Sequence, residues 1–168
     1  ILTNPSNPTG MVYHREELTA LAEVVVAHDI YVLSDEIYCG LVYQGEFVSF
    51  AALGEEVKAR TILVNGMSKS YAMTGWRIGY AASNSEIAKA MSNYLSHSTG
   101  SPCTISQYAS IAAVQESQQT TLEMKNAFAA RRDYFVERVK QIPGVSCLEP
   151  EGAFYIFMNI KEQIGRTL

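Results

Sequence analysis

Four polar side chains follow three short apolar runs of the sequence, at positions where they could act together on a ligand. Asn7 follows the first run, Asp35 and Tyr38 follow the second, and Lys69 follows the third, with Arg77 close behind. Ligands of open α/β sheets bind beyond the carboxyl ends of the strands. If the three runs are parallel strands, an amide, a carboxylate, a phenol and an amine therefore meet at one edge of a sheet.

Pyridoxal phosphate needs this set of side chains. The cofactor requires a lysine for a Schiff base, an acid against its pyridinium nitrogen, donors to its phenolic oxygen and an arginine fork for its phosphate. Each residue alone is weak evidence, because a lysine after a strand is usually solvated and an Asn-Pro pair usually serves a turn. The order and spacing of the residues favour the cofactor site over these simpler interpretations.

The sequence predicts that a mostly parallel sheet positions these residues. Three short β-branched runs, Ile1–Thr3, Ile30–Ser34 and Thr61–Asn65, are typical of buried parallel strands. The first connection carries apolar residues at helical spacing, at Leu18, Leu21, Ala22 and Val25. This pattern predicts a β-α-β unit, whose right-handed crossover keeps its strands parallel.

The chain after Lys69 predicts an antiparallel return and then helices. The run Ile78–Ala82 comes too soon for a crossover helix, so we expect an antiparallel strand that keeps Arg77 at the same edge. Ser85 is the expected N-cap of the next helix. A long helix is predicted over Thr120–Gln141, and two short strands, Val145–Leu148 and Phe154–Ile160, are predicted after it.

Composition excludes several classes of function. The 168 residues are 48% hydrophobic and carry a net charge of −4 without a Lys/Arg block, so we expect no nucleic-acid or membrane-surface partner. The apolar runs are far shorter than the ~20 residues of a membrane span, and no signal segment opens the chain. Three widely spaced cysteines without C-x-x-C spacing predict reduced thiols and no metal site. We expect a soluble, cytoplasmic protein.

The segment 66–79 resembles the cofactor-attachment signature of class I/II aminotransferases along its whole length. It reads GMSKSYAMTGWRIG, and Asn4–Gly10 and Ser34–Tyr38 precede it in the family's order and separation. The resemblance implies the α/β fold of the fold type I pyridoxal-phosphate transferases, with a mostly parallel sheet flanked by helices. It also implies that residues 1–142 belong to the large domain, including the long linking helix, and that residues 143–168 begin a small α+β domain. Both ends of the sequence are abrupt, so we expect the central part of a longer chain.

Carried over to this sequence, the resemblance implies a catalytic role for three residues. Lys69 would carry pyridoxal 5'-phosphate as a Schiff base and then move the proton at the substrate's α-carbon. Asp35 would pair with the pyridinium nitrogen and keep it protonated. Tyr38 would hydrogen-bond the phenolic oxygen of the cofactor, which favours the deprotonated form of the Schiff base.

The resemblance also implies three further cofactor contacts. Asn7 would hydrogen-bond the same phenolic oxygen, and Arg77 would hold the phosphate with two parallel hydrogen bonds, a geometry that lysine cannot supply. Ser68 would donate one more hydrogen bond. The sequence does not decide whether the segment Gly152–Tyr155 packs in the core or lines the site. We expect Glu36 to be solvated or structural.

The loop Ser96–Pro102 and the segment after it resemble the bacterial-type aspartate aminotransferase branch. The resemblance implies a homodimer that transfers an amino group from L-aspartate to 2-oxoglutarate. Aromatic and alanine aminotransferases, C–S lyases and cyclopropane-forming synthases remain alternatives, although the lyases commonly have histidine where this chain has Tyr38. The effector-binding domain of an aminotransferase-like transcription regulator and a non-catalytic truncation product also stay open.

Overall fold

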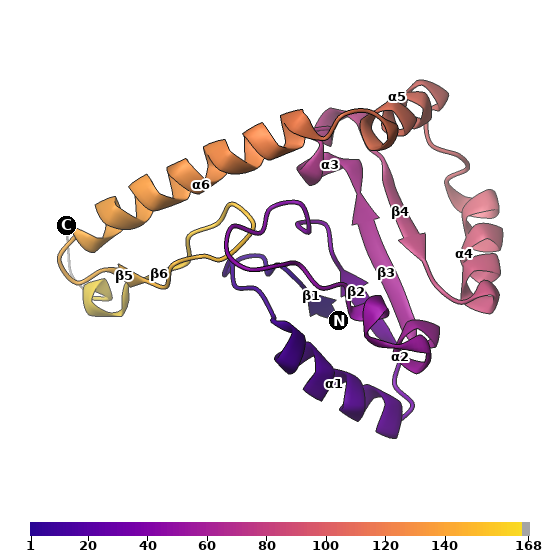
Figure 1. Cartoon of the computed structure of the whole chain (residues 1–168), viewed down its shortest axis with the longest axis horizontal. Helices are drawn as coiled ribbons and strands as arrows, with labels where there is room; N and C mark the ends of the chain where they lie inside the picture. The colour runs from indigo at the N-terminus through magenta and orange to yellow at the C-terminus, as the bar shows by residue number, and fades with distance from the viewer. Residues whose placement is uncertain (166–168) are drawn as a thin grey trace.

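The computed structural model describes residues 1–165, and its centre is a four-stranded sheet in the order β1-β2-β3-β4 (Figure 1). The strands are β1 (Leu2–Thr3), β2 (Val32–Asp35), β3 (Thr61–Gly66) and β4 (Gly79–Ala82). β1, β2 and β3 are parallel, and β4 runs antiparallel to β3. The predicted strand directions are confirmed.

The register of the strands brings the ends that carry polar residues to one edge of the sheet. Thr3 pairs with Asp35, and Asp35 pairs with Val64. Gly66, the last residue of β3, pairs with Gly79, the first residue of β4. The loops that follow β1, β2 and β3, and the loop that precedes β4, therefore leave the sheet at the same edge.

Helix α1 (Arg15–Ala27) packs on the sheet through one apolar face. His14 is the N-cap, and its backbone N–H donates to Glu17 Oε2 at 2.9 Å, which is one of the two hydrogen bonds of a capping box. The buried face then meets residues of β2, of the 3-10 helix η1 (Phe50–Leu53) and of α2 (Glu55–Ala59), in a core formed by Leu18, Ala22, Val25, Val32, Val48, Phe50 and Val57. Leu21, predicted to share the face, is 40% exposed because it lies at the border of this stripe.

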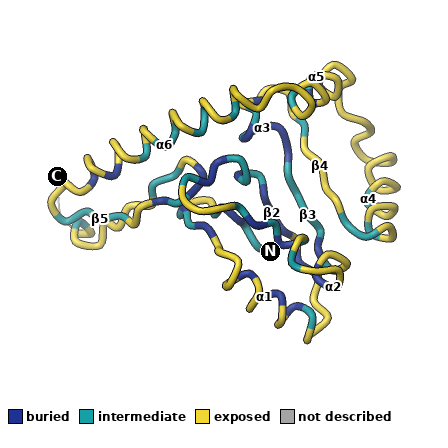
Figure 2. The backbone as a smooth tube through the Cα atoms, in the orientation of Figure 1, coloured by how far each residue is buried: buried dark blue, intermediate teal, exposed yellow. Residues whose placement is uncertain are grey.

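Helices α4 (Ser85–Ser98) and α5 (Thr104–Gln115) follow β4. The N-cap of α4 is Asn84, whose side chain accepts from the backbone N–H of Ile87 at 3.0 Å. The prediction of Ser85 was wrong by one residue, because Asn84 has a non-helical backbone, with φ of −58° and ψ of 159°, whereas Ser85 is already helical. None of the described residues of α4 is buried, and Figure 2 shows the helix as largely exposed.

Helix α6 (Gln119–Lys140) runs away from the sheet toward a two-stranded ladder of β5 (Ser146–Cys147) and β6 (Met158–Asn159), followed by η3 (Lys161–Gln163) (Figure 1). The predicted strand Phe154–Ile160 was wrong over most of its length. Ala153 has a left-handed backbone, with φ of 57°, and the residues after it turn back onto the loop that follows β2. Two backbone hydrogen bonds, from Tyr43 N to Glu151 O and from Ala153 N to Leu41 O, hold the two segments together.

Within residues 1–165 no helix is long and apolar enough to cross a membrane. The same residues contain no cluster of three or more His, Cys, Asp or Glu side chains that could hold a metal ion.

Candidate active site

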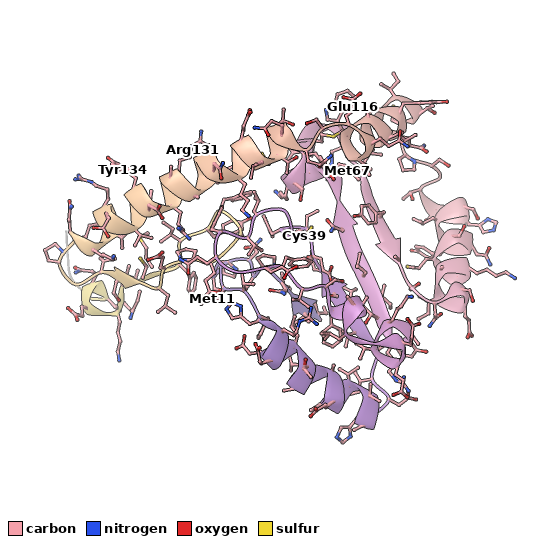
Figure 3. The ribbon with its side chains drawn as sticks, viewed as in Figure 1. Met11, Cys39, Met67, Glu116, Arg131 and Tyr134 are labelled. Carbon is pink, nitrogen blue, oxygen red and sulfur yellow. The ribbon has the colours of Figure 1, made fainter. Side chains whose placement is uncertain are left out.

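Lys69 lies on α3 (Met67–Ser70), a single helical turn that begins directly after β3. The turn depends on Gly66, since a Cβ at that position would lie 2.8 Å from the carbonyl oxygen of Ile78. The backbone N–H of Met67 donates to that carbonyl at 3.1 Å and fixes the start of α3. Figure 3 shows Met67 at this end of β3. The lysine is therefore held one short turn beyond the edge of the sheet.

The Lys69 amine lies among aromatic rings. Nζ is 5.3 Å from the ring centroid of Phe154 and 5.8 Å from that of Tyr38. The two rings meet edge to face at 5.3 Å, and Phe128 of α6 stacks on Phe154 at 5.4 Å. Three segments far apart in the sequence thus form the surroundings of one amine.

The loop after β2 presents Asp35 and Tyr38 at the same edge. Asp35 Oδ1 accepts from the backbone N–H of Ile37 at 3.2 Å, which leaves the second carboxylate oxygen without a hydrogen-bond partner within residues 1–165. Tyr38 is buried, and its hydroxyl lies 2.5 Å from the hydroxyl of Tyr155. Burial is the main reason that the pKa of Tyr38 is raised, and the negative charge of Asp35 adds to the rise. Its hydroxyl therefore keeps its proton and can donate it in a hydrogen bond.

Glu36 points into the core instead of into the site. Its Oε1 accepts from Ser34 Oγ at 3.0 Å, from Ser49 Oγ at 2.9 Å and from the backbone N–H of Phe50 at 3.1 Å. Desolvation raises the pKa of this carboxyl, and the three hydrogen bonds oppose the rise. Of the two alternatives left open for Glu36, solvated or structural, the contacts support the structural one, because Glu36 connects β2 to η1.

Asn7 is connected to Tyr38 through the hydroxyl of Tyr155. Its Nδ2 donates to the hydroxyl of Tyr155 at 3.3 Å, so that Asn7, Tyr155 and Tyr38 form a chain of side-chain contacts. Tyr155 is a site residue that sequence reasoning did not commit to. The only signal for it was the segment Gly152–Tyr155, which left packing and site lining undecided.

The segment that carries Tyr155 fits closely against the site loops. A Cβ at Gly152 would lie 2.9 Å from the Leu41 carbonyl oxygen and 2.9 Å from Pro5 Cβ. The backbone N–H of Gly152 donates to the Gly10 carbonyl at 2.8 Å. Glycine is required at this position by the close approach, and the contact fixes where the following aromatic residues lie.

Arg77 and Ser68 lie outside the contact network of Lys69, Tyr38, Tyr155 and Asn7. Arg77 precedes β4 with a left-handed φ of 53°, is exposed, and donates from Nη1 to the Thr74 carbonyl at 2.7 Å. Within residues 1–165 neither its guanidinium nor the Ser68 hydroxyl has a recorded contact with Asn7, Asp35, Tyr38 or Lys69. The structure thus gathers Lys69, Tyr38 and Asn7 in one contact network, places Asp35 and Arg77 at the same edge, and gives Ser68 no contact with the network.

The donor set fits the requirements of pyridoxal phosphate. Within residues 1–165 it offers an amine without a carboxylate partner, a carboxylate with one oxygen that accepts no hydrogen bond, a protonated phenol, an amide and an exposed guanidinium fork. Left-handed backbones at Ala72, Arg77 and Ala153 flank these groups, as is common for residues around functional sites.

The model of the aminotransferase class I and II family matches residues 1–166. The chain belongs to this family. It is 51% identical over 163 residues to an aspartate aminotransferase of Geobacillus stearothermophilus and 50% identical over 163 residues to one of Bacillus subtilis. Both alignments cover 96% of this chain and 42% of the relative, so the chain spans about two fifths of the length of the curated relatives it matches.

Solved structures of the family have the same fold. The aspartate aminotransferase of Rhizobium meliloti superposes with a TM-score of 0.92 at 43% sequence identity, covering 95% of this chain and 40% of the other. The expected fold class, the α/β fold of the fold type I enzymes with a mostly parallel sheet flanked by helices, is confirmed.

Proposed function

We propose that the full-length protein is a pyridoxal-phosphate-dependent aminotransferase that moves an amino group from L-aspartate to 2-oxoglutarate. The observation that carries the proposal is the position of the Lys69 amine, one turn beyond β3 and close to the Tyr38 ring, whose hydroxyl belongs to the Asn7–Tyr155 network. The identity to aspartate aminotransferases supports the choice of substrate pair.

The bound cofactor would supply the electron sink that makes the substrate's α-proton removable. Lys69 would hold the cofactor through its amine, and the same amine would move the proton at the substrate's α-carbon. Asp35, through the oxygen that accepts nothing in residues 1–165, would accept a hydrogen bond from the protonated ring nitrogen. That charge-assisted bond would keep the nitrogen cationic.

The remaining site residues would bind the cofactor and orient it. Tyr38 and Asn7 would donate hydrogen bonds to the phenolic oxygen. The Arg77 guanidinium, which donates to the Thr74 carbonyl here, would bind the phosphate, and Ser68 would add a hydroxyl donor. We further propose that residues 1–142 are part of the large domain and that residues 143–168 open the small domain, in a cytoplasmic homodimer with small-molecule substrates only.

The test is a steady-state assay of the full-length protein loaded with pyridoxal phosphate. We expect formation of glutamate from 2-oxoglutarate with aspartate as the best donor, ahead of alanine and the aromatic amino acids. Release of pyruvate and ammonia from a cysteine thioether would favour a C–S lyase instead. Cofactor binding without any turnover of amino acids would favour a sensor domain.

A further inference from the structure

We infer that Tyr155 is a positioning residue for Tyr38: it fixes the Tyr38 hydroxyl and makes it a stronger hydrogen-bond donor to the phenolic oxygen of the cofactor. The inference rests on the proposed function. It concerns a residue outside the set that the family signature assigns, on a segment 117 residues away from Tyr38 in the sequence.

The donors and acceptors available to Asn7, Tyr155 and Tyr38 allow one order of hydrogen bonds that leaves the Tyr38 proton for the cofactor. The Asn7 Nδ2 group can only donate, so the oxygen of Tyr155 accepts from it at 3.3 Å. The Tyr155 proton can then be donated to the oxygen of Tyr38, 2.5 Å away. This arrangement leaves the Tyr38 proton for a third group. Either hydroxyl can donate across this contact, and the inferred order is Asn7 to Tyr155, Tyr155 to Tyr38, and Tyr38 to the cofactor.

Hydrogen bonds donated in this order strengthen the last one, which Tyr38 donates to the cofactor. A hydroxyl whose oxygen already accepts a hydrogen bond is polarised and donates more strongly, particularly where burial keeps the local dielectric low. Tyr38 is only 3% exposed. A stronger bond to the phenolic oxygen favours the deprotonated form of the bound cofactor, so Tyr155 lowers the pH at which that form appears.

The Tyr155 hydroxyl is held in place by its backbone and by its ring. The two hydrogen bonds of Gly152 and Ala153 to the Gly10 and Leu41 carbonyls anchor the segment. The Tyr155 ring meets the Tyr38 ring edge to face at 5.6 Å. Because the ring contact survives in phenylalanine, Tyr155→Phe removes the hydroxyl and leaves the packing.

The experiment is a pH titration of the bound cofactor's absorbance in the full-length holoprotein. We expect the apparent pKa to rise in Tyr155→Phe by roughly half a unit to one unit, the effect of one hydrogen bond. The matched control is Tyr134→Phe, at a tyrosine on the outer side of α6 that is 69% exposed (Figure 3). It should titrate like the wild type.

A double variant separates action through Tyr38 from direct action. Tyr38→Phe should raise the apparent pKa by more than Tyr155→Phe does, and Tyr38→Phe/Tyr155→Phe should add nothing further, because the second hydroxyl then has no group to act on. An equal shift in both backgrounds would overturn the inference, as would a Tyr155→Phe protein that titrates like the wild type or fails to fold. The proposed function has a separate test, since wild-type protein without a lysine-bound cofactor would refute it before any variant is compared.

Discussion

At the scale of single residues, two neighbouring carboxylates differ completely in environment. Successive side chains of a strand point to opposite faces, so Asp35 at the end of β2 faces the site while Glu36 turns into the core. The sequence predicted the position of Asp35 because it follows an apolar run. It could not predict the partners of Glu36, since Ser49 and Phe50 lie at the start of η1, after a loop whose path no local pattern determines.

Asp35→Asn should retain the cofactor but slow removal of the α-proton by roughly two to three orders of magnitude, because a charge-assisted hydrogen bond to the ring nitrogen is lost. Single-turnover kinetics with aspartate measure this rate directly. Glu36→Gln is the matched control and should leave the rate near that of the wild type. A near-normal rate in Asp35→Asn would remove Asp35 from the mechanism.

Glu36 should make the protein less stable as the pH rises. Burial raises its pKa above the unfolded value, so the folded state binds more protons than the unfolded state between the two values. Stability attributable to this group is therefore full below the unfolded pKa, near 4.5, and falls as the pH rises through the folded pKa. Thermal melting of wild type and Glu36→Gln from pH 4 upward should show the variant gaining relative to the wild type. A difference that is independent of pH would contradict this origin.

At the scale of elements, the turn that carries Lys69 is positioned by a close contact with the loop that carries Tyr38. A Cβ at Gly40 would lie 2.6 Å from Ser70 Oγ and 2.9 Å from Ser70 Cβ. The hydroxyl could rotate away, but the Cβ of Ser70 cannot. The distance between α3 and the loop after β2 therefore depends on glycine at position 40.

Gly40→Ala should weaken cofactor binding by roughly tenfold, because overpacking of this kind costs about 1–3 kcal/mol and displaces α3. Adding Ser70→Gly leaves Ser70 Cα, 3.5 Å away, as the nearest atom and should recover most of the affinity. Gly75→Ala serves as the control, since no heavy atom lies within 4 Å of the added methyl group. Titration with pyridoxal phosphate gives the affinities. Failure of the double variant to recover would show that the contact does not set the position of α3.

The elements predicted best are those with strong local patterns. The β-α-β unit, the antiparallel β4 and the long α6 follow from apolar periodicity and chain length between strands. Asn84 and Ser85 are both good capping residues, and only the backbone geometry decides between them. The apolar run after Ala153 resembles a strand, yet its aromatic rings pack against Tyr38 and Phe128. These tertiary contacts place Tyr155 in the site, and residue spacing in the sequence does not predict them.

At the scale of the whole molecule, much apolar surface faces outward. All four residues of β4 are exposed, and so are Tyr94 of α4 and Ile105 and Tyr108 of α5. Surfaces of this kind mark contacts with further protein. They agree with a chain that spans 42% of its relatives and with the proposed homodimer.

Residues 1–168 alone should therefore transaminate at a rate more than about tenfold below that of the full-length protein, because catalysis requires substrate and cofactor to be held from all sides. Both proteins should be titrated with pyridoxal phosphate and assayed side by side with aspartate and 2-oxoglutarate. Turnover by the isolated segment within tenfold of the full-length protein would show that the residues named above suffice.

The central claim is that the amine on α3 carries the cofactor. Borohydride reduction of the full-length holoprotein, followed by peptide mapping, locates the attachment directly. We predict the reduced pyridoxyl group on Lys69, and its loss together with the visible absorbance in Lys69→Ala. A label on another lysine, such as Lys58 of α2 or Lys89 of α4, would contradict the account.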